Sequence, residues 1–174
     1  MALAGKKAPE FTEEAVIGSG DFKKVSLSDY KGKWVVLFFY PLDFTFICPT
    51  EITEFSKRDK EFKDLNAVVL GCSTDSKHSH KAWIKGDLGQ LAHPLIADFT
   101  KKIARDYGVL DEADGIAYRG TFIIDPQGVV VTESVNVPRI GRSVSETLRL
   151  LQAAQTGELC PVEWKSGGKT LGKA

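Results

Sequence analysis

The chain has 174 residues, of which 43% are hydrophobic and 26% charged, a composition typical of a soluble globular protein that folds as one domain. Its 23 basic residues balance its 23 acidic residues, so the formal net charge is zero, and no global field favours nucleic acid or an anionic membrane as a partner. Any substrate preference is therefore expected to come from a local site.

The three cysteines, Cys48, Cys72 and Cys160, are too few and too scattered for a disulfide scaffold. The first residues contain no apolar run typical of a signal peptide. The longest apolar stretch, residues 34–42, is far shorter than the roughly 20 residues of a membrane span. We therefore expect a cytoplasmic protein, in which cysteines more often serve chemistry than crosslinking.

The first half of the chain alternates predicted strands and helices. Residues 34–40 form an unbroken β-branched and aromatic run, which suits a strand buried on both faces. Residues 49–63 have the spacing of an amphipathic helix with Pro49 in its first turn. Residues 66–73 are predicted to form a second buried strand, and residues 79–85 a helix.

Further elements follow in the second half. A helix over residues 101–107 is predicted to be capped by Thr100 and ended by Gly108. Residues 121–132 have the pattern of a hairpin, with its turn at 125–128. This alternation of strands and helices favours an α/β protein built in layers.

The last helix and the tail differ in character. Ser143 and Glu146 have the spacing of a capping box that opens a helix, and Gly157 is expected to end it. Residues 158–174 are rich in Gly and Lys and show little apolar periodicity. We therefore expect a domain over residues 1–157 and an exposed C-terminal arm over residues 158–174.

Cys48 is a candidate reactive cysteine, because it lies between a predicted strand and the start of a predicted helix. Helix N-termini carry partial positive charge and free N–H donors, so they favour a thiolate. A further cation is expected, and Arg119 is the candidate. A small buried hydrophobic residue would suit the same place, so position alone does not decide between a reactive and a structural cysteine.

The segment around Cys48 has the spacing Pro41-x-x-x-Thr45-x-x-Cys48, and residues 44–51 read Phe-Thr-Phe-Ile-Cys-Pro-Thr-Glu. This spacing matches the signature of the peroxiredoxins, and the longer string resembles the typical two-cysteine subgroup, which includes alkyl hydroperoxide reductase C and thioredoxin peroxidases. The resemblance covers almost the whole chain, through the blocks Ser73-Thr74-Asp75-Ser76, His80-Lys81-Ala82-Trp83, Tyr118-Arg119-Gly120-Thr121-Phe122-Ile123-Ile124-Asp125, Gly141-Arg142-Ser143 and Gly157-Glu158-Leu159-Cys160-Pro161.

This resemblance implies a thioredoxin-like α/β fold, with a central mixed β-sheet flanked by helices and N-terminal β additions. It implies a thiol-specific peroxidase that reduces hydroperoxides without a metal or an organic cofactor. A thioredoxin-like dithiol or a flavoprotein would return the electrons. The family forms homodimers, often as a ring of five dimers, and residues 76–80 fall where such rings meet.

The resemblance also assigns roles at the site. Cys48 would be the peroxidatic cysteine, and Thr45 would hold the peroxide and the thiolate in line. Arg119 would stabilise the thiolate and the departing oxygen, while Pro41 would shield the site and Glu51 would orient Arg119. Without the motif, Thr45 as a turn cap and Glu51 as a first-turn charge would be the preferred interpretations.

The resemblance gives the other two cysteines different parts. Cys160 would be the resolving cysteine, forming a disulfide with Cys48 of the partner subunit after the turn around Cys48 unwinds. Cys72 lies in a predicted buried strand and is expected to be structural.

Two departures bear on oxidative damage. Peroxiredoxins that excess peroxide inactivates easily carry a Gly-Gly-Leu-Gly loop and a C-terminal Tyr-Phe pair, whereas this chain has Gly-Asp-Leu-Gly at 86–89 and no Tyr-Phe at its end. We therefore expect resistance to overoxidation. The rival hypothesis is an oligomeric holdase chaperone or scaffold, but such a protein has no need of the set Cys48, Thr45 and Arg119.

Overall fold

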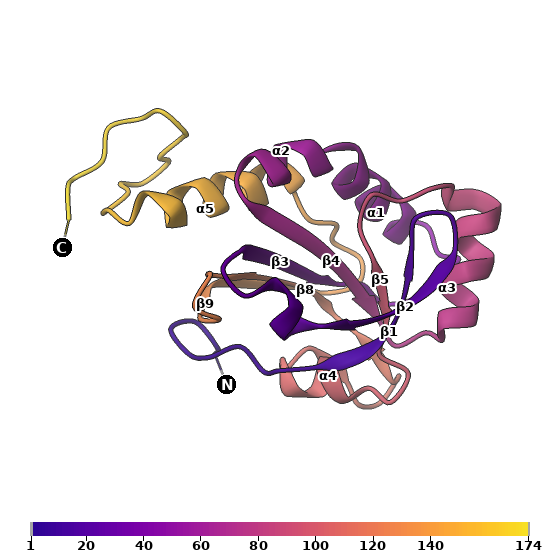
Figure 1. Cartoon of the computed structure of the whole chain (residues 1–174). Coiled ribbons are helices and arrows are strands. Elements are labelled where there is room, and N and C mark those ends of the chain that lie inside the picture. The colour runs from indigo at the N-terminus through magenta and orange to yellow at the C-terminus, as the bar shows by residue number, and fades with distance from the viewer. Residues whose placement is uncertain (1, 174) are drawn as a thin grey trace. The chain divides into compact units, whose positions relative to one another are not determined.

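The computed structural model describes residues 2–173, in two compact units that divide between Arg142 and Ser143. The first unit contains a seven-stranded sheet with helices on both faces and a separate two-stranded ribbon, β6–β7 (Figure 1). Its elements are β1 (Thr12–Ile17), β2 (Asp21–Ser26), a 3₁₀ turn (Leu27–Tyr30), β3 (Trp34–Phe39), α1 (Cys48–Lys57), α2 (Asp59–Asp64), β4 (Ala67–Ser73), α3 (Lys77–Trp83), a π-helical turn (Ile84–Leu88), β5 (Leu95–Ala97), α4 (Lys102–Asp106), β6 (Leu110–Asp111), β7 (Ile116–Ala117), β8 (Arg119–Ile124) and β9 (Val130–Asn136).

The sheet is mixed, with the strand order β2-β1-β5-β4-β3-β8-β9. Strands β3, β4 and β5 run parallel, while β8 pairs antiparallel with β3, and β1 antiparallel with β5. The hairpins β1–β2 and β8–β9 form the two ends of the sheet. A central mixed sheet with an N-terminal β addition is the predicted fold class, and the structure confirms it.

The central strand β3 is buried on both faces, as its apolar run predicts. Val35, Leu37 and Phe39 belong to the core on the α4 side of the sheet. Phe38 points to the other side, where its ring stacks on Phe55 of α1 with centroids 4.4 Å apart. Both faces of the strand are thus covered, which fixes the end of β3 and the loop that follows it.

The predicted helix over residues 49–63 is in fact two helices. Helix α1 ends at Lys57 and α2 begins at Asp59, with Arg58 between them at φ −96° and ψ 10°. The apolar spacing continues across this break, because Phe55 and Phe62 pack against each other with ring centroids 5.8 Å apart. Periodicity alone therefore does not detect the break.

The predicted cap of α4 is wrong. Lys101, at φ 63°, precedes the helix, and the carboxylate of Asp98 rather than the Thr100 hydroxyl accepts its first N–H groups. These donors are the backbone nitrogens of Ile103, at 3.0 Å, and Ala104, at 2.7 Å. The Asp98 side chain, directly after β5, therefore accepts the hydrogen bonds that the N-cap residue of a helix normally accepts.

Helix α3 begins earlier than predicted. Ser76 caps it by accepting from the backbone nitrogen of Ser79 at 3.2 Å, and after Trp83 the chain continues as the π-helical turn.

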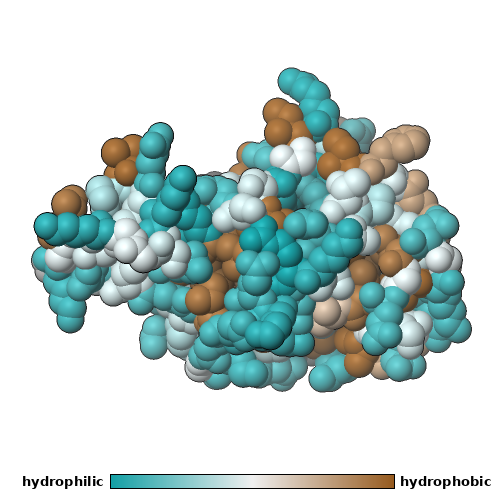
Figure 2. All heavy atoms as spheres, turned by 90° about the horizontal axis from the view of Figure 1, so that it is seen from above, coloured by the Kyte–Doolittle hydropathy of each residue, from teal (hydrophilic) through white to brown (hydrophobic). Residues whose placement is uncertain are grey.

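Among the described residues, no helix combines the length and apolar character needed to cross a bilayer. One face of the molecule, seen from above, shows apolar residues dispersed among polar ones (Figure 2).

The second unit begins with α5 (Val144–Thr156). Ser143 accepts from the backbone nitrogen of Glu146 at 3.1 Å, and Gly157, at φ 62°, ends the helix as predicted. The other half of the predicted capping box is wrong, because the Glu146 carboxylate pairs instead with Arg149 at 2.7 Å. A carboxylate in the first turn of a helix can also pair with a cation one turn later, and here Glu146 pairs with Arg149 rather than with the backbone before the helix.

The C-terminal arm folds back on itself. The backbone of Leu159 donates to Gly172 and accepts from Leu171, both at 2.8 Å, so the segment between them is a closed loop. Trp164 is buried, and its indole nitrogen donates to the Gly168 carbonyl at 3.0 Å. The arm is mostly exposed, as predicted, but Trp164 is an exception.

Candidate active site around Cys48

Cys48 is the first residue of α1 and is fully buried. The loop that leaves β3 brings the chain back to this point, and Pro49 follows in the first helical turn, where a missing N–H costs no hydrogen bond. The sulfur therefore lies at the positive end of a helix, in a setting that favours a negative charge.

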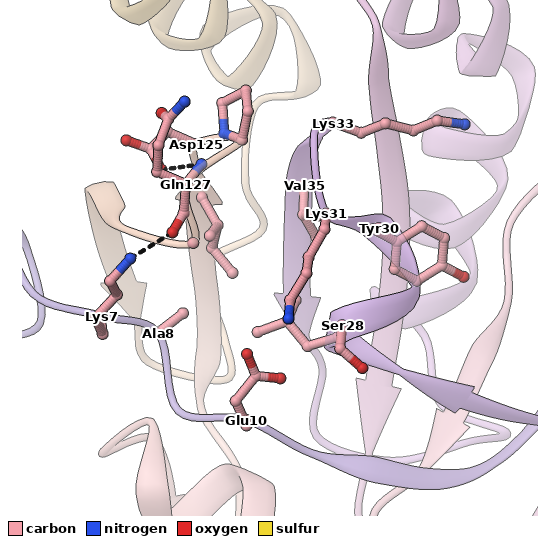
Figure 3. Close-up of a pocket in the computed structure, with 14 residues that line it drawn as sticks. Lys7, Ala8, Glu10, Ser28, Tyr30, Lys31, Lys33, Val35, Asp125 and Gln127 are labelled. Carbon is pink, nitrogen blue, oxygen red and sulfur yellow. Dashed lines mark hydrogen bonds between the residues drawn. The ribbon is translucent and has the colours of Figure 1, made fainter.

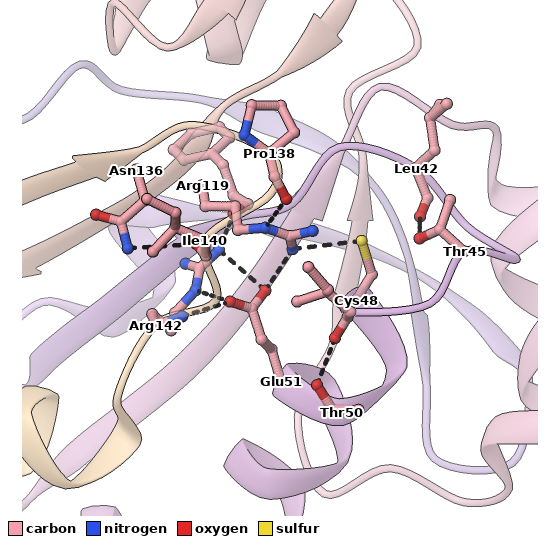
Figure 4. A network of polar contacts seen from close by, with 12 residues as sticks. Leu42, Thr45, Cys48, Thr50, Glu51, Arg119, Asn136, Pro138, Ile140 and Arg142 are labelled. Atoms are coloured by element: carbon pink, nitrogen blue, oxygen red, sulfur yellow. Dashed lines mark hydrogen bonds and ion pairs between the residues drawn. The ribbon is translucent and has the colours of Figure 1, made fainter.

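Arg119 reaches the Cys48 sulfur from β8 (Figure 4). Because β8 runs antiparallel to β3, with Thr121 opposite Phe38, its first residue lies beside the loop that follows β3. The Nη1 of Arg119 donates to Cys48 Sγ at 3.4 Å, and its Nε donates to the Pro138 carbonyl at 2.7 Å. The guanidinium is thus aimed at the sulfur by a second contact made through a different nitrogen.

Glu51 lies one turn after Cys48 and receives two guanidinium groups. Its Oε2 accepts from Arg119 Nη1 at 2.7 Å, and its Oε1 accepts from the backbone nitrogen and Nε of Arg142 at 2.8 and 3.0 Å. Glu51 is 4% exposed, so these interactions occur largely away from water. A carboxylate held by two cations in this way fixes the orientation of both.

Arg142 is the residue of this cluster for which the sequence predicted no role. Its other donors go to the Gly120 carbonyl at 2.8 Å, to Thr121 Oγ1 at 3.0 Å and to the Phe39 carbonyl. Burial lowers the pKa of the Arg142 guanidinium, while Glu51 opposes that shift. The only sequence signal for this residue was the block Gly141-Arg142-Ser143, which resembled the family without indicating a contact.

The charges of the cluster do not cancel without the cysteine. Arg119 and Arg142 contribute two positive charges and Glu51 contributes one negative charge, which leaves a net charge of +1. Cys48 as a thiolate brings the cluster to neutrality. In a buried site, where charges are weakly screened, an excess cation has a strong preference for such a partner.

The structure does not bring the Thr45 hydroxyl to the sulfur. Its Oγ1 donates instead to the Leu42 carbonyl at 2.9 Å, as a local turn contact does. Pro41 is buried in the same loop. Of the predicted site residues, Cys48 and Glu51 are therefore both bonded to Arg119, whereas the Thr45 hydroxyl bonds within its own loop (Figure 4).

The other two cysteines have different surroundings. Cys160, in the second unit, is half-buried, with its sulfur 3.5 Å from Thr156 Oγ1 and 3.8 Å from the Ala153 carbonyl. Cys72 is fully buried in β4, where burial, reinforced by Asp98, raises the pKa of its thiol well above the usual value. Cys72 is therefore a protonated core side chain, and Cys160 is the more accessible thiol.

A pocket of about 430 Å³ lies elsewhere in the first unit, between the 3₁₀ turn after β2 and the β8–β9 turn (Figure 3). Lys7, Lys31 and Lys33 line it, together with Glu10. Lys7 is already engaged, because its ammonium donates to the Gln127 carbonyl at 2.6 Å. Cys48, Glu51, Arg119 and Arg142 are not among the residues that line it.

Comparison with known proteins gives a consistent result. A sequence profile described as the AhpC/TSA family matches residues 4–133. The chain is 55% identical to "Putative peroxiredoxin YkuU" of Bacillus subtilis, covering 97% of this chain and 98% of that protein. It is also 55% identical to "Thioredoxin peroxidase" of Trypanosoma brucei rhodesiense, covering 94% and 87% of the two chains.

Solved structures agree with these relatives. The reduced 2-Cys peroxiredoxin of Plasmodium vivax superimposes with a TM-score of 0.93 at 43% identity, covering 98% of this chain and 93% of that one. The AhpC of Enterococcus faecalis gives a TM-score of 0.88 at 39% identity, covering 92% and 100%. The similarity therefore extends over both units of the chain.

Proposed function

The chain belongs to the AhpC/TSA family and is a thiol peroxidase, and we propose that Cys48 is the nucleophile with which it attacks its peroxide substrate. The observation that carries this proposal is the 3.4 Å contact between Arg119 Nη1 and the Cys48 sulfur. It combines a helix N-terminus with an excess cation at one buried sulfur, and both favour the thiolate.

In the first step the Cys48 thiolate attacks the terminal oxygen of the hydroperoxide. An S–O bond forms as the O–O bond breaks, so the sulfur is oxidised to sulfenic acid and the peroxide is reduced to an alcohol or water after taking up a proton. Arg119 would stabilise the negative charge as it moves from sulfur to the departing oxygen. Glu51 and Arg142 would keep that guanidinium in place.

Two residues of the loop would complete the pocket. Pro41 would exclude water from the sulfur. Thr45 would turn its hydroxyl from the Leu42 carbonyl to the bound peroxide, which requires a rotation about χ1 when the substrate arrives. This rotation would exchange one hydrogen bond for another.

Cys160 is proposed as the resolving cysteine. Its thiol would attack the Cys48 sulfenic acid of a partner subunit, forming a disulfide and releasing water. Cys48 is fully buried at the start of a helix, so its turn must open before a second sulfur can reach it.

The enzyme has a peroxide substrate and a redox partner that returns it to the dithiol state. We propose that this partner is a thioredoxin-like dithiol or a flavoprotein. We also propose that the protein forms homodimers, five of which assemble into a ring. A cytoplasmic setting would supply such reductants. The alternative function, a holdase chaperone, is not favoured by the relatives, which are named as peroxidases and peroxiredoxins.

The test is peroxide consumption in the presence of a dithiol, followed by non-reducing gel electrophoresis after one equivalent of peroxide. Cys48→Ser should abolish consumption, whereas Cys72→Ala, which alters the core thiol, should retain it. A dimer band that is lost in both Cys48→Ser and Cys160→Ser would support the pairing. Consumption by Cys48→Ser at the wild-type rate would refute the proposed nucleophile.

A further inference from the structure

A second buried charge lies five residues before Cys48, in the loop between β3 and α1. The Asp43 side chain is 1% exposed, and three side chains donate to its carboxylate. Its Oδ1 accepts from the Tyr40 hydroxyl at 2.9 Å, and its Oδ2 accepts from Ser79 Oγ at 2.7 Å and from His80 Nδ1 at 2.8 Å. Two of these donors belong to α3, so the carboxylate connects the loop to that helix.

The His80 ring is fully buried between two oxygen acceptors. Its Nδ1 faces Asp43, and its Nε2 lies 3.2 Å from the Ile96 carbonyl of β5. An imidazole donates from both nitrogens only when both carry hydrogen. His93 also faces two carbonyls, but it has no carboxylate partner, and burial lowers the pKa of its ring. The Asp43 carboxylate is thus what distinguishes the His80 site.

Asp43 is also held through its backbone. Its nitrogen donates to Asp75 Oδ2 at 3.0 Å, and Asp75 in turn accepts from Ser73 Oγ at 2.6 Å. The next residue, Phe44, has φ 54°, and its ring packs against Trp83 of α3 with centroids 5.5 Å apart. Phe46, by contrast, is 94% exposed. The loop is therefore attached to α3 at Asp43 and Phe44, and the exposed Phe46 lies between this attachment and Cys48.

We propose that Asp43 and His80 are positioning residues, whose pair anchors the start of the Cys48 loop to α3. This inference rests on the proposed role of Cys48. The anchor keeps the sulfur beside Arg119, and residues 45–47 are the segment that moves. Peroxide attack depends on the placement of the sulfur, whereas disulfide formation requires the turn to open. Loss of the anchor should slow the first step and accelerate the second.

The two steps can be separated by stopped-flow tryptophan fluorescence of the reduced enzyme mixed with hydrogen peroxide. One phase depends on peroxide concentration and reports oxidation of Cys48, and the other does not and reports disulfide formation. Asp43→Ala and His80→Ala should lower the oxidation rate constant about tenfold or more and raise the constant for disulfide formation. Protein that merely fails to fold would lose signal amplitude and keep both rate constants.

Asp43→Asn provides a variant that keeps the fold. Its amide can accept from Tyr40 and donate to His80 and Ser79, so each hydrogen bond is replaced while the charge is lost. Oxidation should still slow by about threefold or more, because the neutral contact is weaker. Wild-type rate constants in Asp43→Asn would overturn the proposal.

Lys81→Ala is the control, because Lys81 lies on the same helix outside residues 76–80, and its ammonium lies 4.5 Å from the Phe22 ring centroid rather than on the loop. It should keep both wild-type rate constants, and a loss equal to that of His80→Ala would overturn the proposal. Failure of the proposed function would be distinct, since peroxide consumption would then not depend on Cys48. A Cys48-dependent wild type with unaltered rate constants in the folded anchor variants would refute the anchor alone.

Discussion

One nitrogen of Arg119, Nη1, lies 3.4 Å from the Cys48 sulfur and at the same time 2.7 Å from the Glu51 carboxylate. The sulfur and the carboxylate thus share a donor, and both are buried. A change in the charge of the sulfur therefore alters the interaction of the guanidinium with Glu51, and a change at Glu51 alters its interaction with the sulfur.

Replacing Arg119 with lysine should lower the rate constant for Cys48 oxidation about 10²-fold, the scale of losing a preorganised donor. An ammonium is a single point charge and cannot hold the sulfur, Glu51 and the Pro138 carbonyl together. Single-turnover stopped-flow kinetics would measure the change. Arg139→Lys, at an exposed position nearby, is the control, and equal rate constants for the two variants would contradict the prediction.

Glu51→Gln should lower the free energy of unfolding by about 3–5 kcal/mol, because it leaves two buried guanidinium groups without their shared anion. Urea denaturation would measure this loss. Glu61→Gln is the matched control, since Glu61 also pairs with an arginine but is 53% exposed, and its loss should cost less than about 1 kcal/mol. Similar losses in both variants would argue against a buried charge cluster at Glu51.

Sulfinic acid at Cys48 should accumulate only at a large excess of peroxide. Residues 84–88 form a π-helical turn with the sequence Ile-Lys-Gly-Asp-Leu, so Asp87 stands where the sensitive loop has its second glycine. Rapid disulfide formation then protects the sulfenic acid. Mass spectrometry of peroxide-treated enzyme would measure the product. Cys160→Ser, which cannot form the disulfide, should overoxidise readily, and equal sensitivity of the wild type would contradict the prediction.

Acid should destabilise the fold through His93. Burial lowers the pKa of this imidazole below its ordinary value of 6.5, so the unfolded chain binds more protons than the folded one as the pH falls past 6.5. The stability contribution is present above that pH and is lost below it, by at most about 1.4 kcal/mol per pH unit.

The measurement is urea denaturation of wild type and His93→Gln at pH values between 5 and 7.5. The wild type should lose stability more steeply toward low pH than the variant. Contributions from Asp75 and Asp98, whose pKa values burial raises, are common to both proteins and cancel in the difference. An equal pH dependence of the free energy of unfolding in the two proteins would contradict the assignment of this effect to His93.

The sequence was most informative where one short segment determines the structure. The run at 34–39 is apolar at every position, so β3 could be predicted from it alone. The start of α1 at Cys48 follows from Pro49 and the break before it. The end of α5 could likewise be predicted from Gly157 alone, because glycine readily adopts the left-handed conformation found there, at φ 62°.

The missed features depend on residues far apart in the chain. Asp98 caps α4 from the end of β5, which replaces the local cap that Thr100 suggested. Arg142 contacts Glu51 across 91 positions, and no local pattern indicates such a pair. The present partner of Thr45, the Leu42 carbonyl, was not predicted either, and its role toward the peroxide stays a prediction.

Arg142 has a consequence for synthesis of the chain on the ribosome. Its side chain connects the end of β3, the start of β8 and the first turn of α1, yet it is the last residue of the first unit to be translated. A nascent chain that is still missing this residue has neither the second cation nor these contacts. The charged surroundings of the Cys48 sulfur are therefore complete only when translation of that unit ends.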